Sequence, residues 1–147
     1  MIGVAALQQR AHKLLKQLGK KKQDDKLKYP GWTFEEKAWH NERRSDLVVR
    51  WSGQSQPLRL AFAWPYTSEK RPENEPPKFV KEARARLAAC PGSLVVVPAR
   101  DPSDKVVDAL VAENDAQVPV VYLHRLESWL DKKYKADTEK PSGPTTP

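Results

Sequence analysis

Aromatic and basic side chains interleave through the first half of the sequence, and together these residue types can recognise nucleic acid. The aromatic residues are Trp32, Trp39, Trp51, Trp64 and Tyr66, and the basic residues among them are Arg43, Arg44, Arg50 and Arg59. Aromatic rings stack on bases, and the planar guanidinium group of arginine pairs with phosphate oxygens. Large aromatic side chains also contribute much of the burial energy of a core. The pattern therefore indicates either a nucleic-acid surface or a core rich in tryptophan.

Lysines give the N-terminal third of the chain its positive charge. The formal net charge is +7, and residues 1–50 hold 12 Lys and Arg against 6 Asp and Glu. This asymmetry favours a polyanionic partner, and we expect nucleic acid, with DNA as the first candidate. The predicted phosphate contacts in this part are Lys13, Lys16, Lys20, Lys21 and Lys22. The alternative is a solvated helix face that serves only solubility.

Residues typical of metal or nucleotide chemistry are scattered along the sequence. His12, His40 and His124 lie far apart, and Cys90 is the single cysteine, so the spacing typical of a zinc site is missing. The six glycines form no phosphate-binding loop. We therefore expect neither a metal nor another cofactor.

A basic amphipathic helix is predicted over residues 2–22. Leu7, Ala11, Leu14 and Leu18 follow at intervals of four, three and four residues, which predicts a narrow apolar stripe. The stripe can pack on the rest of the chain, or bind a second copy or a partner protein through Leu7, Leu14 and Leu18. We divide the chain into this helix with a linker (1–28), an α/β core domain (29–133) and a disordered tail (134–147).

A β-hairpin is predicted between Asp46 and Trp64. Two apolar runs flank a polar turn that contains Gly53. In the second run, Leu58, Leu60, Phe62 and Trp64 share one face of the strand, and Arg59, Ala61 and Ala63 share the other.

Helices and buried strands alternate on either side of this hairpin. We expect helices over residues 34–44, over 78–90, after Asp104 and over 125–133, and strands over 93–98 and 118–123. The order predicts an α/β fold with a small mixed sheet, in which the hairpin lies beside two strands joined by helical crossovers.

This order of elements resembles the PD-(D/E)xK nuclease superfamily between about residues 34 and 130. In that family an Asp on the first hairpin strand, a Glu-x-Lys on the second and often a Glu on the preceding helix hold a divalent metal, which activates water. Asp46 matches the Asp, and Glu36 is the candidate for the helical Glu. The Glu-x-Lys position falls on Ala61-Phe62-Ala63, which lacks both the carboxylate and the lysine.

Because a hard cation needs at least two fixed anionic ligands, the resemblance implies a nuclease-like fold without catalysis. The leading prediction is therefore a pseudo-enzyme that binds nucleic acid as an accessory or regulatory protein. The alternative is a metal-dependent DNA endonuclease, using Mg²⁺ or Mn²⁺, in which a displaced residue replaces the missing ligand. The candidates for that residue are Glu69, Lys70, Glu73 and Glu75.

Arg50 and Arg59 are expected on the same face of the hairpin as Asp46, Ala61 and Ala63. That face should then attract anions, and removing both arginines should weaken binding without unfolding the domain. The sequence contains no apolar run of the ~20 residues that a membrane helix needs, and no secretory signal is recognised. We expect an intracellular, cytoplasmic protein.

Overall fold

The computed structural model describes residues 4–38, 45–54, 56–65, 77–88, 90, 92–99, 101–102, 104–113 and 118–138. The helices are α1 (Val4–Lys20), α2 (Lys78–Leu87), α3 (Lys105–Ala112) and α4 (Leu126–Thr138), with the 3-10 turn η1 (Leu123–Arg125) before α4. The strands are β1 (Lys22–Gln23), β2 (Lys26–Leu27), β3 (Thr33–Ala38), β4 (Ser45–Arg50), β5 (Leu58–Phe62), β6 (Leu94–Val97) and β7 (Val120–Tyr122). Among the described helices, none has the length and apolar character that crossing a membrane requires.

Five strands form one mixed sheet in the order β3-β4-β5-β6-β7. Strands β3, β4 and β5 are antiparallel neighbours, whereas β6 and β7 are added by parallel pairing. Helix α2 connects β5 to β6, and α3 connects β6 to β7. The predicted α/β class, the hairpin of β4 and β5 and the two crossover-connected strands are therefore confirmed.

The helix predicted over residues 34–44 is wrong, because Thr33–Ala38 is strand β3. This strand pairs with β4 along its whole length, from Thr33 opposite Arg50 to Ala38 opposite Ser45. Phe34 packs edge-on against His12 of α1, with ring centroids 4.8 Å apart. Pairing with β4 and this contact override the helix propensity of the segment. Residues 39–44, which include Trp39 and His40, lie outside the described part of the chain.

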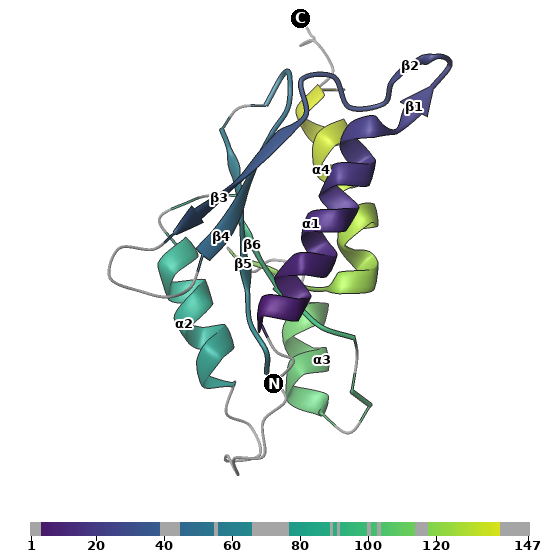
Figure 1. The fold of residues 1–147 in the computed structure, drawn as a ribbon. Coiled ribbons are helices and arrows are strands. Elements are labelled where there is room, and N and C mark those ends of the chain that lie inside the picture. The colour runs from purple at the N-terminus through teal and green to yellow at the C-terminus, as the bar shows by residue number, and fades with distance from the viewer. Residues whose placement is uncertain are drawn as a thin grey trace, which may run out of the picture.

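Helices cover the sheet on both faces, as Figure 1 shows. On one face, α1 and α4 lie side by side over the leucines of β4 and β5. On the other face, α2 packs on β5 and β6, and α3 packs on β7. The alternation predicted along β5 is confirmed, since Leu58, Leu60 and Phe62 belong to the first cluster and Ala61 and Ala63 to the second.

The apolar stripe of α1 is buried within the chain itself. Leu7, Ala11, Leu15 and Leu18 are at most 2% exposed, whereas Leu14 is only partly buried. The stripe thus passes through Leu15, which lies four residues after Ala11 and three before Leu18, and both intervals keep a residue on one helix face. Because Leu7 and Leu18 belong to the core, they are not available to a second copy or a partner protein in this structure.

Two boundaries differ from those expected. After α1 the chain forms a small antiparallel ribbon of β1 and β2 in place of a linker. Asp24 and Asp25 make its turn with φ of 53° and 62°, a conformation that Asp tolerates better than most residues. At the other end, α4 continues to Thr138, beyond the predicted end at Lys133. Residues 139–147 lie outside the described part of the chain.

Leu15→Ala should lower the free energy of unfolding by about 2–5 kcal/mol, because it leaves a cavity between α1 and the sheet. Leu14→Ala is the matched control and should cost clearly less, since Leu14 is partly exposed. Urea denaturation followed by circular dichroism measures both losses. A larger loss for Leu14→Ala would mean that α1 packs through a different face.

Candidate nucleic-acid interface

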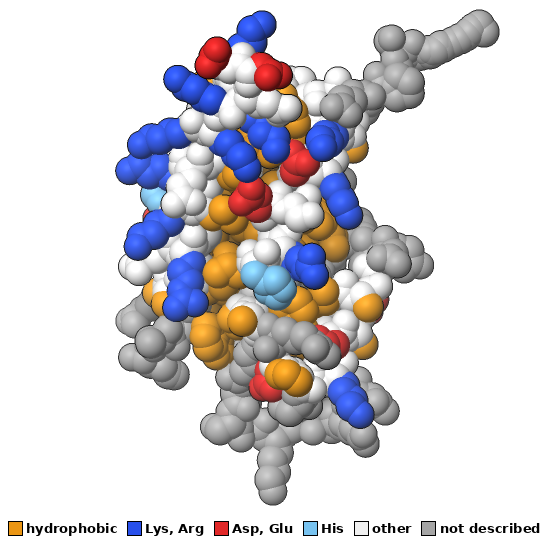
Figure 2. All heavy atoms as spheres, turned by 90° about the vertical axis from the view of Figure 1, so that its right-hand side faces the viewer, with side chains coloured by type: hydrophobic (Ala, Val, Ile, Leu, Met, Phe, Trp, Pro, Cys, Tyr) orange, Lys and Arg blue, Asp and Glu red, His pale blue; other side chains and the backbone are white. Residues whose placement is uncertain are grey.

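Three of the predicted lysine contacts lie on the outer surface of α1. Lys13, Lys16 and Lys20 are exposed, because the buried stripe occupies the opposite side of the helix. No ion pair joins any of the three to another described residue. Figure 2 shows the side of the molecule on which α1 and α4 lie, with basic side chains gathered along one edge. Their charges are therefore available to an anionic ligand.

The other two predicted lysines follow the end of α1. Lys22 is exposed in β1. Lys21 Nζ lies 2.9 Å from Glu127 Oε2 of α4, and the two side chains are 43% and 46% exposed. An ion pair so exposed contributes little to stability, but it neutralises the charge of Lys21 locally.

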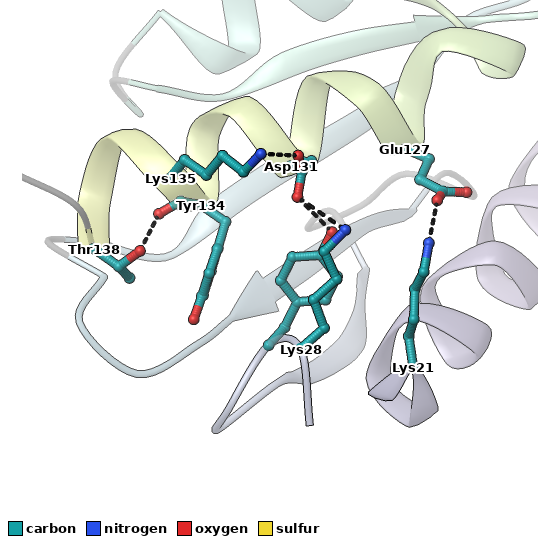
Figure 3. A network of polar contacts seen from close by, with 8 residues as sticks. Lys21, Lys28, Glu127, Asp131, Tyr134, Lys135 and Thr138 are labelled. Atoms are coloured by element: carbon teal, nitrogen blue, oxygen red, sulfur yellow. Dashed lines mark hydrogen bonds and ion pairs between the residues drawn. The ribbon is translucent and has the colours of Figure 1, made fainter. Parts of the chain in front are cut away.

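A polar network fixes the segment after α1 to α4, as Figure 3 shows. Asp131 accepts a hydrogen bond of 2.8 Å from the Tyr29 hydroxyl, and its carboxylate lies 3.5 Å from Lys28 and 3.1 Å from Lys135. Burial, and then the bond to Asp131, raises the pKa of Tyr29. Burial alone would raise the pKa of Asp131, but the hydrogen bonds from Tyr29 and Lys135 and the charge of Lys28 lower it.

The predicted arginine contacts do not form one patch. Arg50 Nη1 donates a hydrogen bond of 2.8 Å to Glu35 Oε1, and this bond together with the arginine charge lowers the pKa of Glu35. Arg59 points instead to Asp46, although both arginines lie on the sheet face of Asp46, as expected from the strand period. Arg43 and Arg44 lie outside the described residues.

Asp46 is a buried charge on the α2 side of the sheet, with 0% exposure. Arg59 Nε donates a hydrogen bond of 3.0 Å to Asp46 Oδ2, and Arg86 Nη2 of α2 lies 3.9 Å from Oδ1. Two guanidinium groups thus compensate a carboxylate that would be costly to bury alone. The sequence pattern did not single out Arg86. Its position three residues after Ala83, which is buried, is the signal that places it on the inner side of α2.

The nuclease-like ligand candidates do not come together. Glu36 lies opposite Leu47, and Lys37 lies opposite Asp46, in the pairing of β3 with β4. Because successive residues of a strand face opposite sides, Glu36 is on the α1 face of the sheet and Asp46 on the α2 face. Glu36 also contacts α1, since it accepts a hydrogen bond of 3.4 Å from Gln8. The predicted pair of Glu36 and Asp46 therefore cannot bind one metal ion.

The face expected to form a cleft is filled by helices. Ala61 and Ala63 are 0% exposed and belong to one cluster with Val80 and Ala83 of α2. Charged side chains at these two positions would be buried among apolar groups. Within the described residues, no three His, Cys, Asp or Glu side chains gather where they could hold a metal ion. The displaced-ligand candidates Glu69, Lys70, Glu73 and Glu75 lie outside those residues.

The tryptophans divide between the core and a surface pocket. Trp51 is 5% exposed and belongs to the core, and it stacks on the partly buried Trp32 with ring centroids 5.7 Å apart. Trp64 is only partly buried and lines a pocket with Arg10 and His124, two residues that were not predicted as contacts. Trp39 and Tyr66 lie outside the described residues.

The candidate interface thus consists of the exposed lysines of α1. Asp46 and its two arginines lie on the opposite side of the sheet and are not part of it. No family model, characterised protein or solved structure matches the chain. We therefore argue its function from the geometry of these residues, and the nuclease-like relationship stays a prediction.

Arg59→Ala should lower the free energy of unfolding by about 3 kcal/mol, because Asp46 stays buried without the guanidinium bonded to it. This replaces the expectation that Arg50 and Arg59 can be removed without unfolding. Arg50→Ala, which breaks an exposed pair, is the matched control and should change stability little. Urea denaturation measures both variants. Wild-type stability of Arg59→Ala would show that Asp46 does not depend on this bond.

Asp131→Asn should reduce the acid dependence of stability. Folding lowers the pKa of Asp131, so its carboxylate stabilises the fold above the unfolded pKa of about 3.9. That contribution is lost as the pH falls through the folded value. The variant should be less stable than wild type at neutral pH, and the two should converge below about pH 4. Urea denaturation across this range, with Asp24→Asn as control, tests this; a constant difference would contradict it.

Proposed function

We propose that this chain binds nucleic acid through the outer face of α1, as a non-catalytic accessory or regulatory domain. The observation that carries the proposal is the row of Lys13, Lys16 and Lys20, exposed and without ion pairs to other described residues. Clustered cations of this kind supply the electrostatic part of nucleic-acid binding, because they release the counterions condensed on phosphates.

The row is held in place before any ligand binds. The buried stripe anchors α1 on the sheet, and Trp32 Nε1 donates a hydrogen bond of 2.9 Å to the carbonyl of Leu15. At a rise of 1.5 Å per residue, Lys13 and Lys20 lie about 10 Å apart along the helix axis, roughly three phosphate steps of one B-DNA strand. A helix fixed in this way loses less conformational freedom on binding than a flexible tail.

We further propose that the domain is nuclease-like, and the order of the strands supports this. Three antiparallel strands are followed by the crossover helix α2 and the parallel strand β6, although the helix expected over residues 34–44 is replaced by strand β3. Asp46 of β4 and Ala61 of β5 lie on the same face of neighbouring strands, as the resemblance requires of the metal-binding positions.

The surroundings of Asp46 argue against metal-dependent cleavage. A metal-dependent nuclease needs fixed anionic ligands around its cation, whereas here the guanidinium of Arg59 is bonded to the carboxylate. Ala61 and Ala63 offer no ligand and are covered by α2. The described residues therefore give no support to the alternative of a metal-dependent endonuclease.

The combined variant Lys13→Gln, Lys16→Gln and Lys20→Gln should weaken binding to a fluorescently labelled DNA duplex at low salt. Each phosphate contact contributes about 0.9 to the slope of log affinity against log salt, so the slope should become shallower by about 2–3. The matched control removes three exposed lysines elsewhere, through Lys37→Gln, Lys78→Gln and Lys105→Gln. Fluorescence anisotropy over a range of salt concentrations gives both slopes.

An equal loss in the two triple variants would show that net charge, and not the α1 face, determines binding. Wild-type affinity that does not change with salt would end the proposal. The same titrations with single-stranded DNA and with RNA decide which nucleic acid is preferred.

A further inference from the structure

A pocket of about 220 Å³ lies at the carboxyl ends of the three parallel strands. Trp64, Pro98 and Leu123 follow β5, β6 and β7 within two residues of each strand end, and all three line the pocket. Arg10 of α1 and His124 of η1 complete the rim. In open α/β sheets, ligands bind at the carboxyl ends of the strands, where the connections leave room between them.

The lining combines apolar walls with two nitrogen donors. Trp64, Leu123 and Pro98 present carbon surfaces, and an indole is a good partner for stacking. Arg10 and His124 form no ion pair with another described residue. The ring of His124 is held by stacking on Tyr122, with centroids 5.6 Å apart and planes inclined by 14°. Such a site suits a flat aromatic group that carries an anion.

The pocket is continuous with the basic face of α1. Arg10, Lys13, Gln17 and Lys20 follow at intervals of three, four and three residues, which places them on one side of the helix. Figure 2 shows hydrophobic side chains at the centre of this side of the molecule, next to the edge of basic side chains. A strand whose phosphates follow α1 therefore reaches the pocket at Arg10.

We infer that this pocket takes one unpaired nucleobase of a bound strand, with the adjoining phosphate at Arg10. The inference rests on the proposed function and adds a preference for single-stranded or frayed ends. The volume is below the range of about 300–1,000 Å³ usual for larger ligands, so it suits a single base, while the sugar and phosphate stay outside. Trp64 supplies the stacking surface, and His124 supplies a hydrogen bond to the base edge.

The experiment compares a short labelled DNA strand with an abasic strand of the same length and charge. Wild type should bind the strand with bases about tenfold more tightly, the usual effect of stacking one base on an aromatic ring. Trp64→Leu should remove this difference and leave the affinity for the abasic strand unchanged. Trp64→Phe should retain much of the difference. Thermal unfolding of each variant confirms that the fold is kept.

The possible failures are distinguishable. Equal wild-type affinity for the two strands would overturn the base pocket and leave binding by the α1 lysines intact. If neither these strands nor the labelled duplex binds, the proposed function fails, and adenosine 5′-monophosphate then tests the pocket alone. The indole N–H resonance of Trp64, assigned with Trp64→Phe, should shift on addition of the nucleotide. If the resonance does not shift at any nucleotide concentration tested, the base pocket is overturned as well.

Discussion

The packing of α1 against the sheet is the constraint on which the other features depend. Its buried stripe closes the larger of the two core clusters and turns the lysines outward. The position of the helix along its axis is fixed at Gly19, where a Cβ atom would lie 2.7 Å from Cδ1 of Trp32. Trp32 in turn stacks on Trp51. The packing of α1 on the sheet thus positions Lys13, Lys16 and Lys20, and it also positions Arg10, which lines the pocket.

Asp46 is a charged side chain buried between the sheet and the helices that cover it. A buried carboxylate has to be compensated by a cation, and in a metalloenzyme a divalent ion can meet this need. Here Arg59 and Arg86 meet it with side chains from β5 and α2. The carboxylate is therefore satisfied within the protein and retains little attraction for an external cation.

Local sequence patterns predicted the elements whose hydrophobic periodicity is simple. They failed where the conformation or contact of a segment depends on residues far away in the sequence. The alternation of β5 and the apolar runs of β6 and β7 were sufficient, because burial alone defines those strands. Segment 33–38 has helical propensity and becomes a strand only through its pairing with β4. Leu14 and Leu15 both satisfy a spacing of three or four residues, so the buried one could not be chosen from sequence. Arg86 is 40 residues from Asp46, beyond any local rule.

Ion pairing, more than net charge, locates the surface available to a polyanion. On α2, Arg84 Nη2 lies 2.6 Å from Glu113, its Nε donates a hydrogen bond to the carbonyl of Val118, and Arg86 faces Asp46. Arg84 holds α2 to the end of α3 and to the segment before β7, and Arg86 holds it to β4, so using these cations for phosphate would cost the contacts they make. On α1 the apolar stripe already supplies the anchoring, so its lysines have no structural task among the described residues. The charges of Arg84 and Arg86 on α2 are thus compensated by Glu113 and Asp46, whereas Lys13, Lys16 and Lys20 on α1 have no ion pair with another described residue.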